Sequence, residues 1–223
     1  LKKSRQTNPQ KQPLVITESL FSMEGTTAPI KEISKLCIKY DSKLLIDEAH
    51  AFGVMGPAGR GESFGFKESI SIISGTFGKA FGGGGAFLAT DKITGENLIQ
   101  NCGAFRYTTA LAPPLCASAL AALNLIERNP AWGSELKKKS IAIRDKLSQI
   151  GWQRPVGQGP IISLILGSDQ LALDYQKRLE AQRLLTIAIR PPTVPEGKSR
   201  LRLVIRRNTP VQAFDRLIKV LKN

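Results

Sequence analysis

The chain is organised by short apolar runs that are separated by segments of helical pattern. Two of these runs, L-V-I-T-E-S-L-F at 14–21 and L-L-I-D at 44–47, predict buried strands of a parallel sheet. Between them, from Pro29 to about Tyr40, isoleucines recur at helical spacing, and Pro29 suits a first helical position. Two further strands are predicted at 69–74 and 85–89. This β-α-β series predicts an α/β domain whose sheet is mostly parallel.

A different order of elements begins near residue 130. Two helices are predicted at 113–128 and 132–150, with Asn129 and Pro130 between them. The first is rich in Ala and Leu and is expected to be buried, whereas the second is expected to expose its Lys137–Lys139 run. A strand, a helix, two strands and a closing helix follow, at 161–166, 169–184, 186–190, 200–206 and 211–222. We therefore expect two domains, an α/β domain over 1–130 and a small α+β domain over 131–223.

Charge and cysteine content restrict the classes of partner. The net charge is +14, of which residues 1–130 hold +3 (14 Lys+Arg, 11 Asp+Glu) and residues 131–223 hold +11 (18 and 7). A basic surface attracts anions, but no basic motif interleaved with aromatic residues is present, so no nucleic-acid partner is predicted. No apolar run approaches the ~20 residues of a membrane span, so no membrane partner is predicted either. Three widely spaced cysteines, which are expected to be buried free thiols, favour a reducing, cytoplasmic compartment: Cys37, Cys102 and Cys116.

The tetrapeptide D-E-A-H at 47–50 is typical of nucleic-acid helicases. Such a motor also needs a phosphate-binding loop of the form G-x-x-x-x-G-K-[S/T]. The nearest candidate, Gly78-Lys79, is followed by Ala80, and Ile73 stands where the first glycine is required. The helicase interpretation is therefore disfavoured, and another chemistry is favoured for the same tetrapeptide.

Asp47, His50 and Lys79 are candidates for one pocket. Asp47 ends a predicted strand, and Lys79 lies 32 residues later in a Gly-rich turn after another strand. Ligands of open α/β sheets bind outside the carboxyl ends of the strands. A lysine in a buried turn is easier to deprotonate, and a neutral amine forms a Schiff base with an aldehyde. A carboxylate can keep a pyridine nitrogen protonated, and the hydroxyls of Ser74 and Thr76 with nearby backbone N–H groups can hold a phosphate. Aldehyde, pyridine and phosphate together describe pyridoxal 5′-phosphate (PLP). Taken singly, each residue also has an ordinary structural explanation, such as a helix cap or a surface lysine.

Six motifs in order extend this hypothesis along nearly the whole chain past residue 14. They resemble the α-oxoamine synthases, a branch of the fold-type-I PLP-dependent enzymes, and the last of them most resembles the 8-amino-7-oxononanoate synthase branch. The resemblance implies part of a large, mostly parallel-sheet domain followed by a small C-terminal α+β domain. The motifs are T-E-S-L-F-S-M-E-G (17–25), A-P-I (28–30), L-I-D-E-A-H (45–50), G-x-x-G-x-x-G-R-G (53–61), T-F-G-K-A-F-G (76–82) and I-R-P-P-T-V-P-E-G-K-S-R-L-R (189–202).

The resemblance implies a role for each matching residue around the cofactor. Lys79 would bond covalently to PLP and later move protons at the substrate α-carbon. Asp47 would pair with the pyridine nitrogen, and His50 and Ser22 would hydrogen-bond the phenolic oxygen. Thr76 would contact the phosphate. Glu48 has no assigned catalytic role.

Three further residues are implied to contact the substrates or a second subunit. Thr109 would reach the phosphate of a neighbouring subunit's cofactor, which implies a homodimer. Thr193 would contact the acyl substrate, and Arg202 would pair with the amino-acid carboxylate through a bidentate guanidinium. The implied reaction condenses L-alanine with an acyl thioester, pimeloyl-CoA or its carrier-protein counterpart, with loss of CO₂. No metal site is predicted.

Members of the resembled family are nearly twice as long as this chain, so we expect a C-terminal portion. We predict that these residues alone bind cofactor poorly and turn over little. Two alternatives remain open: another α-oxoamine synthase with a different acyl donor, or an inactive truncated or accessory subunit that pairs with a full-length relative. The sequence leaves the identity of the acyl donor open.

Overall fold

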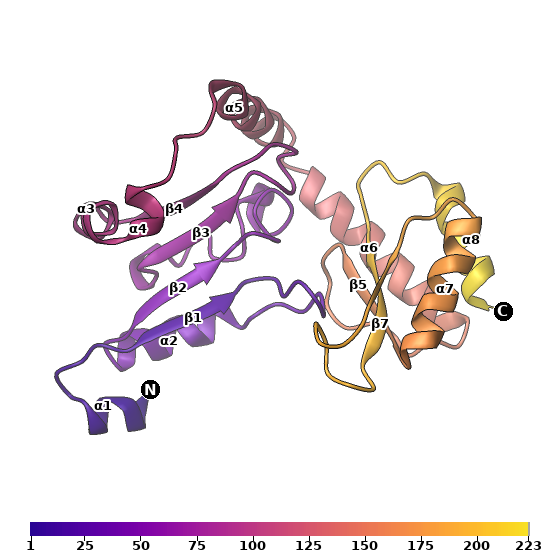
Figure 1. Ribbon diagram of the computed structural model, residues 1–223, viewed down its shortest axis with the longest axis horizontal. Helices are drawn as coiled ribbons and strands as arrows, with labels where there is room; N and C mark the ends of the chain where they lie inside the picture. The colour runs from indigo at the N-terminus through magenta and orange to yellow at the C-terminus, as the bar shows by residue number, and fades with distance from the viewer. Residues whose placement is uncertain (223) are drawn as a thin grey trace. The chain divides into compact units, whose positions relative to one another are not determined.

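The computed structural model describes residues 1–222, which form two compact units. Unit 1 consists of Leu1–Leu20 and Thr27–Gly133, and unit 2 consists of Phe21–Thr26 and the residues from Ser134 onward. The backbone therefore passes from one unit to the other three times (Figure 1). Among the described residues, no helix has both the length and the apolar character needed to cross a membrane.

Unit 1 contains a four-stranded sheet in the order β1-β2-β3-β4 (Figure 1). The first three strands are parallel and the last pair is antiparallel. Glu18 pairs with Asp47, and Asp47 pairs with Ser74, so the carboxyl ends of the parallel strands meet at one edge of the sheet. The strands are β1 (Leu14–Glu18), β2 (Lys43–Asp47), β3 (Ile72–Thr76) and β4 (Ala86–Thr90).

Helix α2 covers one face of this sheet. Helix α2 packs Ile30 and Cys37 against Leu44 and Ile46 of β2, and all four side chains are buried. Leu44 and Ile46 alternate with polar or partly exposed neighbours, as expected of a strand with one covered face. The helices are α1 (Lys2–Thr7), α2 (Ile30–Lys39), α3 (Lys92–Asn101), α4 (Gly103–Arg106) and α5 (Pro113–Arg128), with 3₁₀ turns η1 (Pro57–Gly59) and η2 (Lys67–Ser69).

Two expectations for unit 1 are wrong. The strand at 14–21 was expected to be buried, but β1 is an edge strand in which Leu14 and Ile16 are 51% and 66% exposed. The Ala- and Leu-rich helix at 113–128 forms as α5, yet Ala119 is its only buried residue. Apolar composition predicted both elements correctly, but it says nothing about whether a neighbouring segment covers them.

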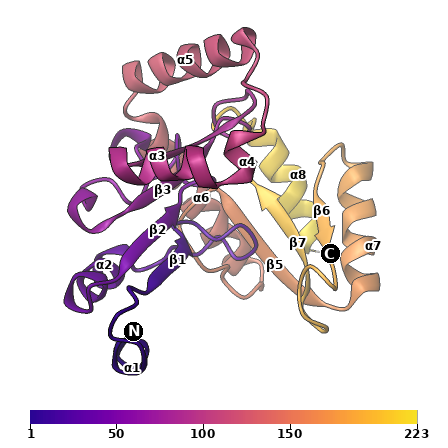
Figure 2. The ribbon, with the colours of Figure 1, turned by 60° about the vertical axis from the view of Figure 1, so that its left-hand side comes forward.

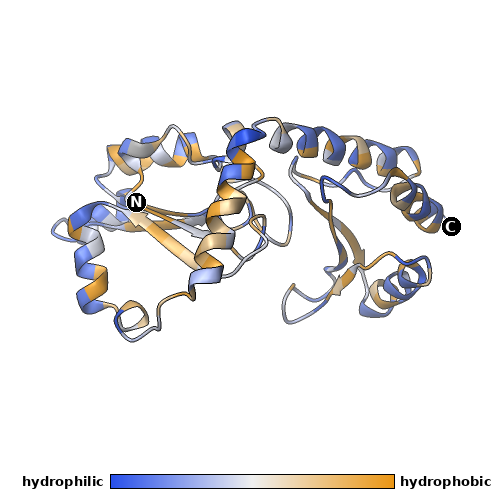
Figure 3. Cartoon of the chain, turned by 90° about the horizontal axis from the view of Figure 1, so that it is seen from above, coloured by the Kyte–Doolittle hydropathy of each residue, from blue (hydrophilic) through white to orange (hydrophobic). Residues whose placement is uncertain are grey.

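Unit 2 contains a three-stranded antiparallel sheet in the order β5-β7-β6. Helix α7 lies beside this sheet (Figure 2), and its cap is formed by Ser168, whose hydroxyl accepts a hydrogen bond from the Leu171 N–H at 3.1 Å. Figure 3 shows hydrophobic colouring along the strands and mixed colouring on the helices, as expected of amphipathic helices that cover a sheet. The elements are α6 (Trp132–Gln149), β5 (Ile161–Gly167), α7 (Asp169–Ala181), β6 (Ile187–Ile189), β7 (Ser199–Val204) and α8 (Val211–Lys222).

Arg144 of α6 is fully buried, and its cationic group faces backbone oxygens rather than a carboxylate. The guanidinium donates to the carbonyl oxygens of Val156, Gly159 and Ile161 at 3.1, 2.9 and 2.6 Å, and to that of Ser140 at 3.2 Å. Burial lowers the pKa of Arg144 to about 10, with a further contribution from the nearby Arg154. The side chain thereby holds the loop that leads into β5.

The expectations for the lysine run and for the cysteines need correction. Lys137 and Lys138 are exposed, but the Lys139 ammonium group donates to the Arg207 and Thr209 carbonyl oxygens at 2.9 and 2.7 Å. All three cysteines are free, but only one is buried: Cys37 is buried, Cys102 is partly exposed and Cys116 is exposed. Burial raises the pKa of the Cys37 thiol.

Candidate active site

Asp47 lies at the carboxyl end of β2, the central position among the parallel strands of unit 1. Its Oδ1 atom accepts a hydrogen bond from the Ala49 N–H at 2.7 Å, which fixes the orientation of the half-buried carboxylate. Within residues 1–222, its Oδ2 atom has no hydrogen-bond donor. One carboxylate oxygen is therefore held by the backbone and the other remains able to accept a proton or a hydrogen bond.

A Gly-rich turn follows the adjacent strand β3. The Thr76 hydroxyl donates to the Gly85 carbonyl oxygen at 3.0 Å and accepts from the Gly78 N–H at 3.1 Å. Gly85 has φ +94°, and a Cβ there would lie 2.4 Å from a methyl carbon of Leu111, so this position requires glycine. Thr76 thus closes the turn with its own side chain, in addition to any contact it makes with a ligand.

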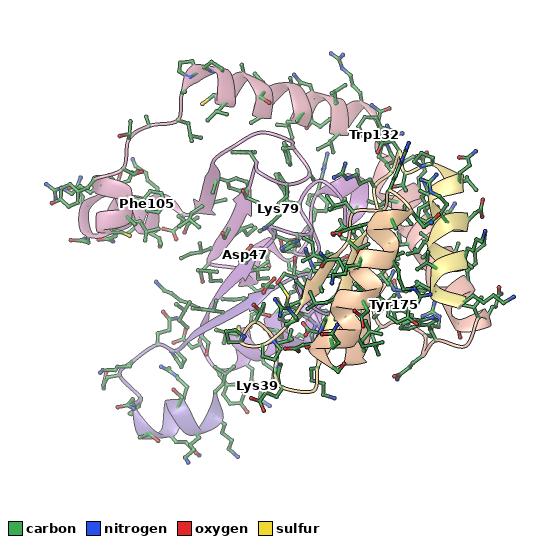
Figure 4. The ribbon with its side chains drawn as sticks, turned by 45° about the vertical axis from the view of Figure 1, so that its right-hand side comes forward. Lys39, Asp47, Lys79, Phe105, Trp132 and Tyr175 are labelled. Carbon is green, nitrogen blue, oxygen red and sulfur yellow. The ribbon has the colours of Figure 1, made fainter. Side chains whose placement is uncertain are left out.

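Lys79 lies in this turn, three residues beyond the end of β3, and Figure 4 labels it together with Asp47 in unit 1. Its carbonyl oxygen accepts a hydrogen bond from the Gly82 N–H at 3.0 Å. The side chain is exposed, as are Gly78 and Ala80 beside it, so the expected burial of Lys79 is wrong for the described residues. The turn projects from the carboxyl edge of the sheet, which presents the amine rather than enclosing it.

The remaining predicted residues of unit 1 occupy different settings. His50 is half-buried in the turn that follows β2, close in sequence to Asp47. Thr109 is exposed in the segment between α4 and α5. The sheet edge therefore assembles Asp47, Thr76 and Lys79 on neighbouring strand ends, and the predicted role of Thr109 toward a second subunit stays a prediction.

Unit 2 brings together two of its predicted residues, Ser22 and Arg202. Arg202 lies on β7, and its Nε atom donates to the Ser22 carbonyl oxygen at 2.7 Å. Burial lowers the pKa of the Arg202 guanidinium, because partial desolvation disfavours the cation. Among the described residues, its two terminal nitrogens have no hydrogen-bond or salt-bridge partner. A desolvated cation with a fixed orientation and free terminal donors is suited to a carboxylate.

Thr193, the third predicted residue of unit 2, lies in a turn after β6. Its N–H donates to the Arg190 carbonyl oxygen at 3.0 Å, and its side chain is exposed. The structure places Thr193 in unit 2, and among the described residues it makes no hydrogen bond to Ser22 or Arg202. Its predicted role toward the acyl substrate stays a prediction.

A second arginine of β7, Arg200, also holds the Phe21–Thr26 loop, and sequence reasoning assigned no role to it. Arg200, 5% exposed at its side chain, donates from Nη1 to Glu24 Oε1 at 3.0 Å and from Nε to the Lys198 carbonyl oxygen at 3.1 Å. Arg200 and Arg202 are two residues apart on a strand, so they project from the same face. The Phe21–Thr26 loop is therefore fastened to unit 2 by both arginines. The R-L-R spacing was visible in the sequence, but its partner Glu24 is 176 residues away.

Sequence reasoning also left Glu48 without a role. Its carboxylate is buried and accepts hydrogen bonds from the Ser19 hydroxyl and the Ser63 N–H, both at 2.6 Å, and from the Glu62 N–H at 3.3 Å. Glu48 therefore ties the end of β1 to the loop after η1. Strand alternation after the buried Ile46 was the available signal that position 48 turns inward.

A cavity of about 180 Å³ lies elsewhere in unit 1. Phe52 and Phe81, whose rings stack at 4.9 Å between centroids, form part of its wall together with residues of α5. Its lining contains none of the predicted site residues. The candidate chemistry therefore lies at the open sheet edge rather than in this cavity.

The model of the family "Aminotransferase class I and II" matches residues 1–221. The 8-amino-7-oxononanoate synthase of Lysinibacillus sphaericus is 35% identical over 223 residues, which is 99% of this chain and 57% of that protein. The same enzyme of Thioalkalivibrio sulfidiphilus is 38% identical, over 93% of this chain and 54% of that protein. The chain thus spans about half the length of the curated relatives it matches.

Solved structures agree on the fold. A serine palmitoyltransferase of Sphingomonas wittichii is similar with a TM-score of 0.88 at 26% identity, over 96% of this chain and 54% of that chain. An 8-amino-7-oxononanoate synthase of Francisella tularensis is similar with a TM-score of 0.83 at 26% identity, over 99% of this chain and 65% of that chain. The predicted fold-type-I architecture is confirmed, and the chain belongs to the aminotransferase class I and II family.

Proposed function

We propose that this chain is the C-terminal part of a PLP-dependent 8-amino-7-oxononanoate synthase of biotin biosynthesis. The enzyme would condense L-alanine with pimeloyl-CoA or pimeloyl-carrier protein and release CO₂. The observation that carries the proposal is the placement of Asp47 and the Thr76–Lys79 turn on adjacent parallel strand ends. Relatives with this enzyme name at 35% and 38% identity support it.

The residues present fit PLP. Asp47 offers a carboxylate oxygen that has no donor within residues 1–222, and Lys79, in the Gly-rich turn after the adjacent strand, offers an exposed primary amine. PLP, when bound, supplies an aldehyde and a protonated pyridine ring that accepts electron density from the substrate α-carbon. Among the solved structures similar to this chain is one of serine palmitoyltransferase (SPT) with PLP.

Each residue of unit 1 has a defined task under this proposal. Asp47 holds a proton on the pyridine nitrogen, and the Ala49 N–H keeps its carboxylate oriented for this. Lys79 would hold the cofactor through its side-chain amine, and it would also move a proton at the substrate α-carbon. His50 donates a hydrogen bond to the phenolic oxygen, and Thr76 orients the phosphate.

The residues outside that sheet edge orient substrates or join subunits. Arg202 binds the carboxylate of L-alanine through its two terminal nitrogens, because its Nε atom is already held by Ser22. Ser22 hydrogen-bonds the phenolic oxygen, and Thr193 contacts the acyl thioester. Thr109 reaches the phosphate of the cofactor that a second subunit binds, so the enzyme is a homodimer. Unit 1 would be the C-terminal part of the large cofactor domain, and unit 2 the small domain.

The location and the acyl partner complete the proposal. Three free thiols are compatible with a reducing compartment, and we place the enzyme in the cytoplasm. The net charge of +11 over residues 131–223 suits the phosphates of coenzyme A or an acidic carrier protein. A second candidate is another α-oxoamine synthase, which the similarity to serine palmitoyltransferase favours. An accessory subunit that pairs with a full-length relative is the third, because the chain spans about half of its relatives.

Borohydride reduction in the presence of PLP tests the cofactor role directly. We expect mass spectrometry of the digested chain to find the reduced phosphopyridoxyl group on Lys79, with loss of that label in Lys79→Ala. Lys92→Ala is the matched control, because Lys92 is an exposed lysine of the same unit. Labelling spread equally over surface lysines would overturn the proposal for Lys79.

Product formation is tested separately, with L-alanine and pimeloyl-CoA. We expect little turnover from these residues alone, and turnover restored when the N-terminal half of a relative is added. Comparing pimeloyl-CoA with palmitoyl-CoA in that reconstituted enzyme distinguishes the first two candidates. An enzyme that uses palmitoyl-CoA in preference would contradict the biotin assignment.

A further inference from the structure

Ser163 and Arg202 are direct partners in the antiparallel pair β5–β7 of unit 2. Side chains of directly opposed residues leave the same face of a sheet, with Cβ atoms about 4.5–5.5 Å apart. Their neighbours Leu201 and Leu203 point to the opposite face, where both are buried. Ser163 and Arg202 therefore share the face onto which Arg200 and Arg202 fasten the Phe21–Thr26 loop.

The Ser163 hydroxyl is buried and unsatisfied. The residue is 9% exposed, and its Oγ atom has no hydrogen-bond partner among residues 1–222. Buried hydroxyls are nearly always hydrogen-bonded, so an exception of this kind calls for a ligand group or an ordered water. A serine hydroxyl offers one donor and can also accept.

Arg202 supplies a cation on the same face of the sheet as the Ser163 hydroxyl. Its Nε–H donates to the Ser22 carbonyl oxygen at 2.7 Å, which directs the guanidinium and leaves both terminal nitrogens without a partner in the described chain. The neighbouring Arg200 is paired with Glu24 at 3.0 Å, so Arg200 is not available to an incoming anion. Within residues 1–222, Arg202 therefore has no counter-charge.

We propose that Ser163 and Arg202 form one carboxylate-binding subsite, in which the Ser163 hydroxyl donates a hydrogen bond to the anion held by the two terminal nitrogens of Arg202. The ligand is the α-carboxylate of a small amino acid. This inference rests on the role proposed above for Arg202, and it assigns to Ser163 a substrate contact. A carboxylate satisfies the charge of Arg202 and the orphaned hydroxyl at once, whereas a water molecule would leave the charge uncompensated.

Thr186, the residue before β6, provides a matched control beside the same sheet. Its hydroxyl is also buried and without a partner in residues 1–222. It precedes Ile187, the β6 residue opposite Arg202, so strand alternation directs Thr186 away from the face that holds Arg202. Thr186→Val therefore removes an equivalent unsatisfied hydroxyl without altering the proposed subsite.

Nitrogen-15 NMR of the labelled chain tests the proposal without requiring activity. L-Alanine is added stepwise, and L-alaninamide, which lacks the carboxylate, serves as the comparison ligand. We expect saturable shifts of the Arg202 Nε–H and Ser163 N–H signals with L-alanine only. Ser163→Ala is expected to weaken binding by roughly ten-fold or more, as for one hydrogen bond to a charged group, and Ser163→Thr to restore it. Thr186→Val should leave the dissociation constant unchanged.

The inference would be overturned by no saturable shift at Arg202 and Ser163, by equal binding of L-alaninamide, or by wild-type affinity in Ser163→Ala. Urea unfolding separates binding from folding, because removing an unpartnered hydroxyl should not lower the unfolding midpoint. A lowered midpoint in Ser163→Ala would indicate a structural role and would also contradict the proposal.

Labelling of Lys79 by PLP without carboxylate binding would refute this subsite alone. Carboxylate binding without Lys79 labelling would refute the cofactor proposal alone.

Discussion

The Glu48 carboxylate lies against Gly61 so closely that a Cβ at Gly61 would be 2.7 Å from the carboxyl carbon. Gly61 also has φ +88°, a backbone conformation that favours glycine. The buried acid and the glycine are therefore a matched pair in unit 1, with the Ser19 hydroxyl and the Ser63 N–H completing the site at 2.6 Å each. Two letters of the helicase-like tetrapeptide thus have different uses, since Asp47 faces the sheet edge and Glu48 fastens the fold.

Gly61→Ala is expected to destabilise unit 1, because the new methyl group displaces the Glu48 carboxylate from its donors. Gly65→Ala is the control, since Gly65 has φ +96° but no atom within 4 Å of an added Cβ. Backbone strain should cost both variants about 1–2 kcal/mol, and the steric conflict should cost Gly61→Ala about 2 kcal/mol more. Urea unfolding followed by circular dichroism measures the difference. Equal midpoints for the two variants would show that the Glu48 contact carries no energy.

Arg144 is expected to tolerate no substitution, including lysine. Its guanidinium serves four backbone carbonyls from a fixed planar group, whereas an ammonium group has three donors. We expect Arg144→Lys to lower the free energy of unfolding by about 3 kcal/mol. Arg154→Lys, at an exposed arginine paired with Asp145, should cost about 0.5 kcal/mol or less. A fully stable Arg144→Lys variant would be incompatible with this account.

Breaking the Glu24–Arg200 pair should loosen the Phe21–Thr26 loop. Glu24→Gln keeps a hydrogen-bond acceptor but leaves the buried Arg200 cation without its counter-charge. Because the Glu24 side chain is 49% exposed, water screens the pair, and we expect a loss of about 1 kcal/mol. Faster hydrogen exchange at the Gly25 N–H, which bonds the Phe21 carbonyl oxygen, would report the loosening. Glu96→Gln, in the exposed pair with Lys92, should change neither quantity.

The three thiols should differ in reactivity toward iodoacetamide at pH 8. Cys116 is exposed and should react first, whereas Cys37 should react only on unfolding, because burial excludes the reagent and raises the pKa of its thiol. Rapid alkylation of Cys37 in the folded chain would contradict its burial on the face of α2 that packs against β2.

The same raised pKa predicts a pH dependence of stability. Above about pH 8.5 the unfolded Cys37 thiol loses its proton while the folded thiol keeps it. The stabilisation is therefore complete below that pH and is lost as the pH rises through the folded value. The decline should be smaller in Cys37→Ala and unchanged in Cys116→Ala, as measured by urea unfolding at several pH values.

Local sequence pattern predicted most elements of the fold. The closing helix at 211–222 and the helix at 113–128 have the predicted bounds, because apolar spacing and a proline at the start determine both. The strand expected at 69–74 is shifted to Ile72–Thr76, since Lys67–Ser69 forms a 3₁₀ turn. The short helices α3 and α4 were not predicted, because their apolar residues are few and no single period dominates.

Some residues of the candidate site could likewise be predicted from the sequence, and others could not. Asp47 and Lys79 were found because motif spacing and strand ends are properties of the sequence. Glu24, Arg200 and Ser163 were missed because their significance depends on long-range pairing: Glu24 meets Arg200 across 176 residues, and Ser163 meets Arg202 across a strand register. Exposure was the least predictable property, as Lys79 and α5 show, since it depends on what covers a residue.

The assignment of Phe21–Thr26 to unit 2 has a consequence for any attempt to dissect the gene. A single cut at the 133–134 boundary would yield two polypeptides, and the C-terminal one would lack the loop that meets Arg200 and Arg202. Expressed by itself, the C-terminal polypeptide would contain Arg200 without its partner Glu24, and the face of β7 that the loop covers would be exposed. A faithful excision of unit 2 would therefore require grafting six residues from the N-terminal region back onto it, as a discontinuous module.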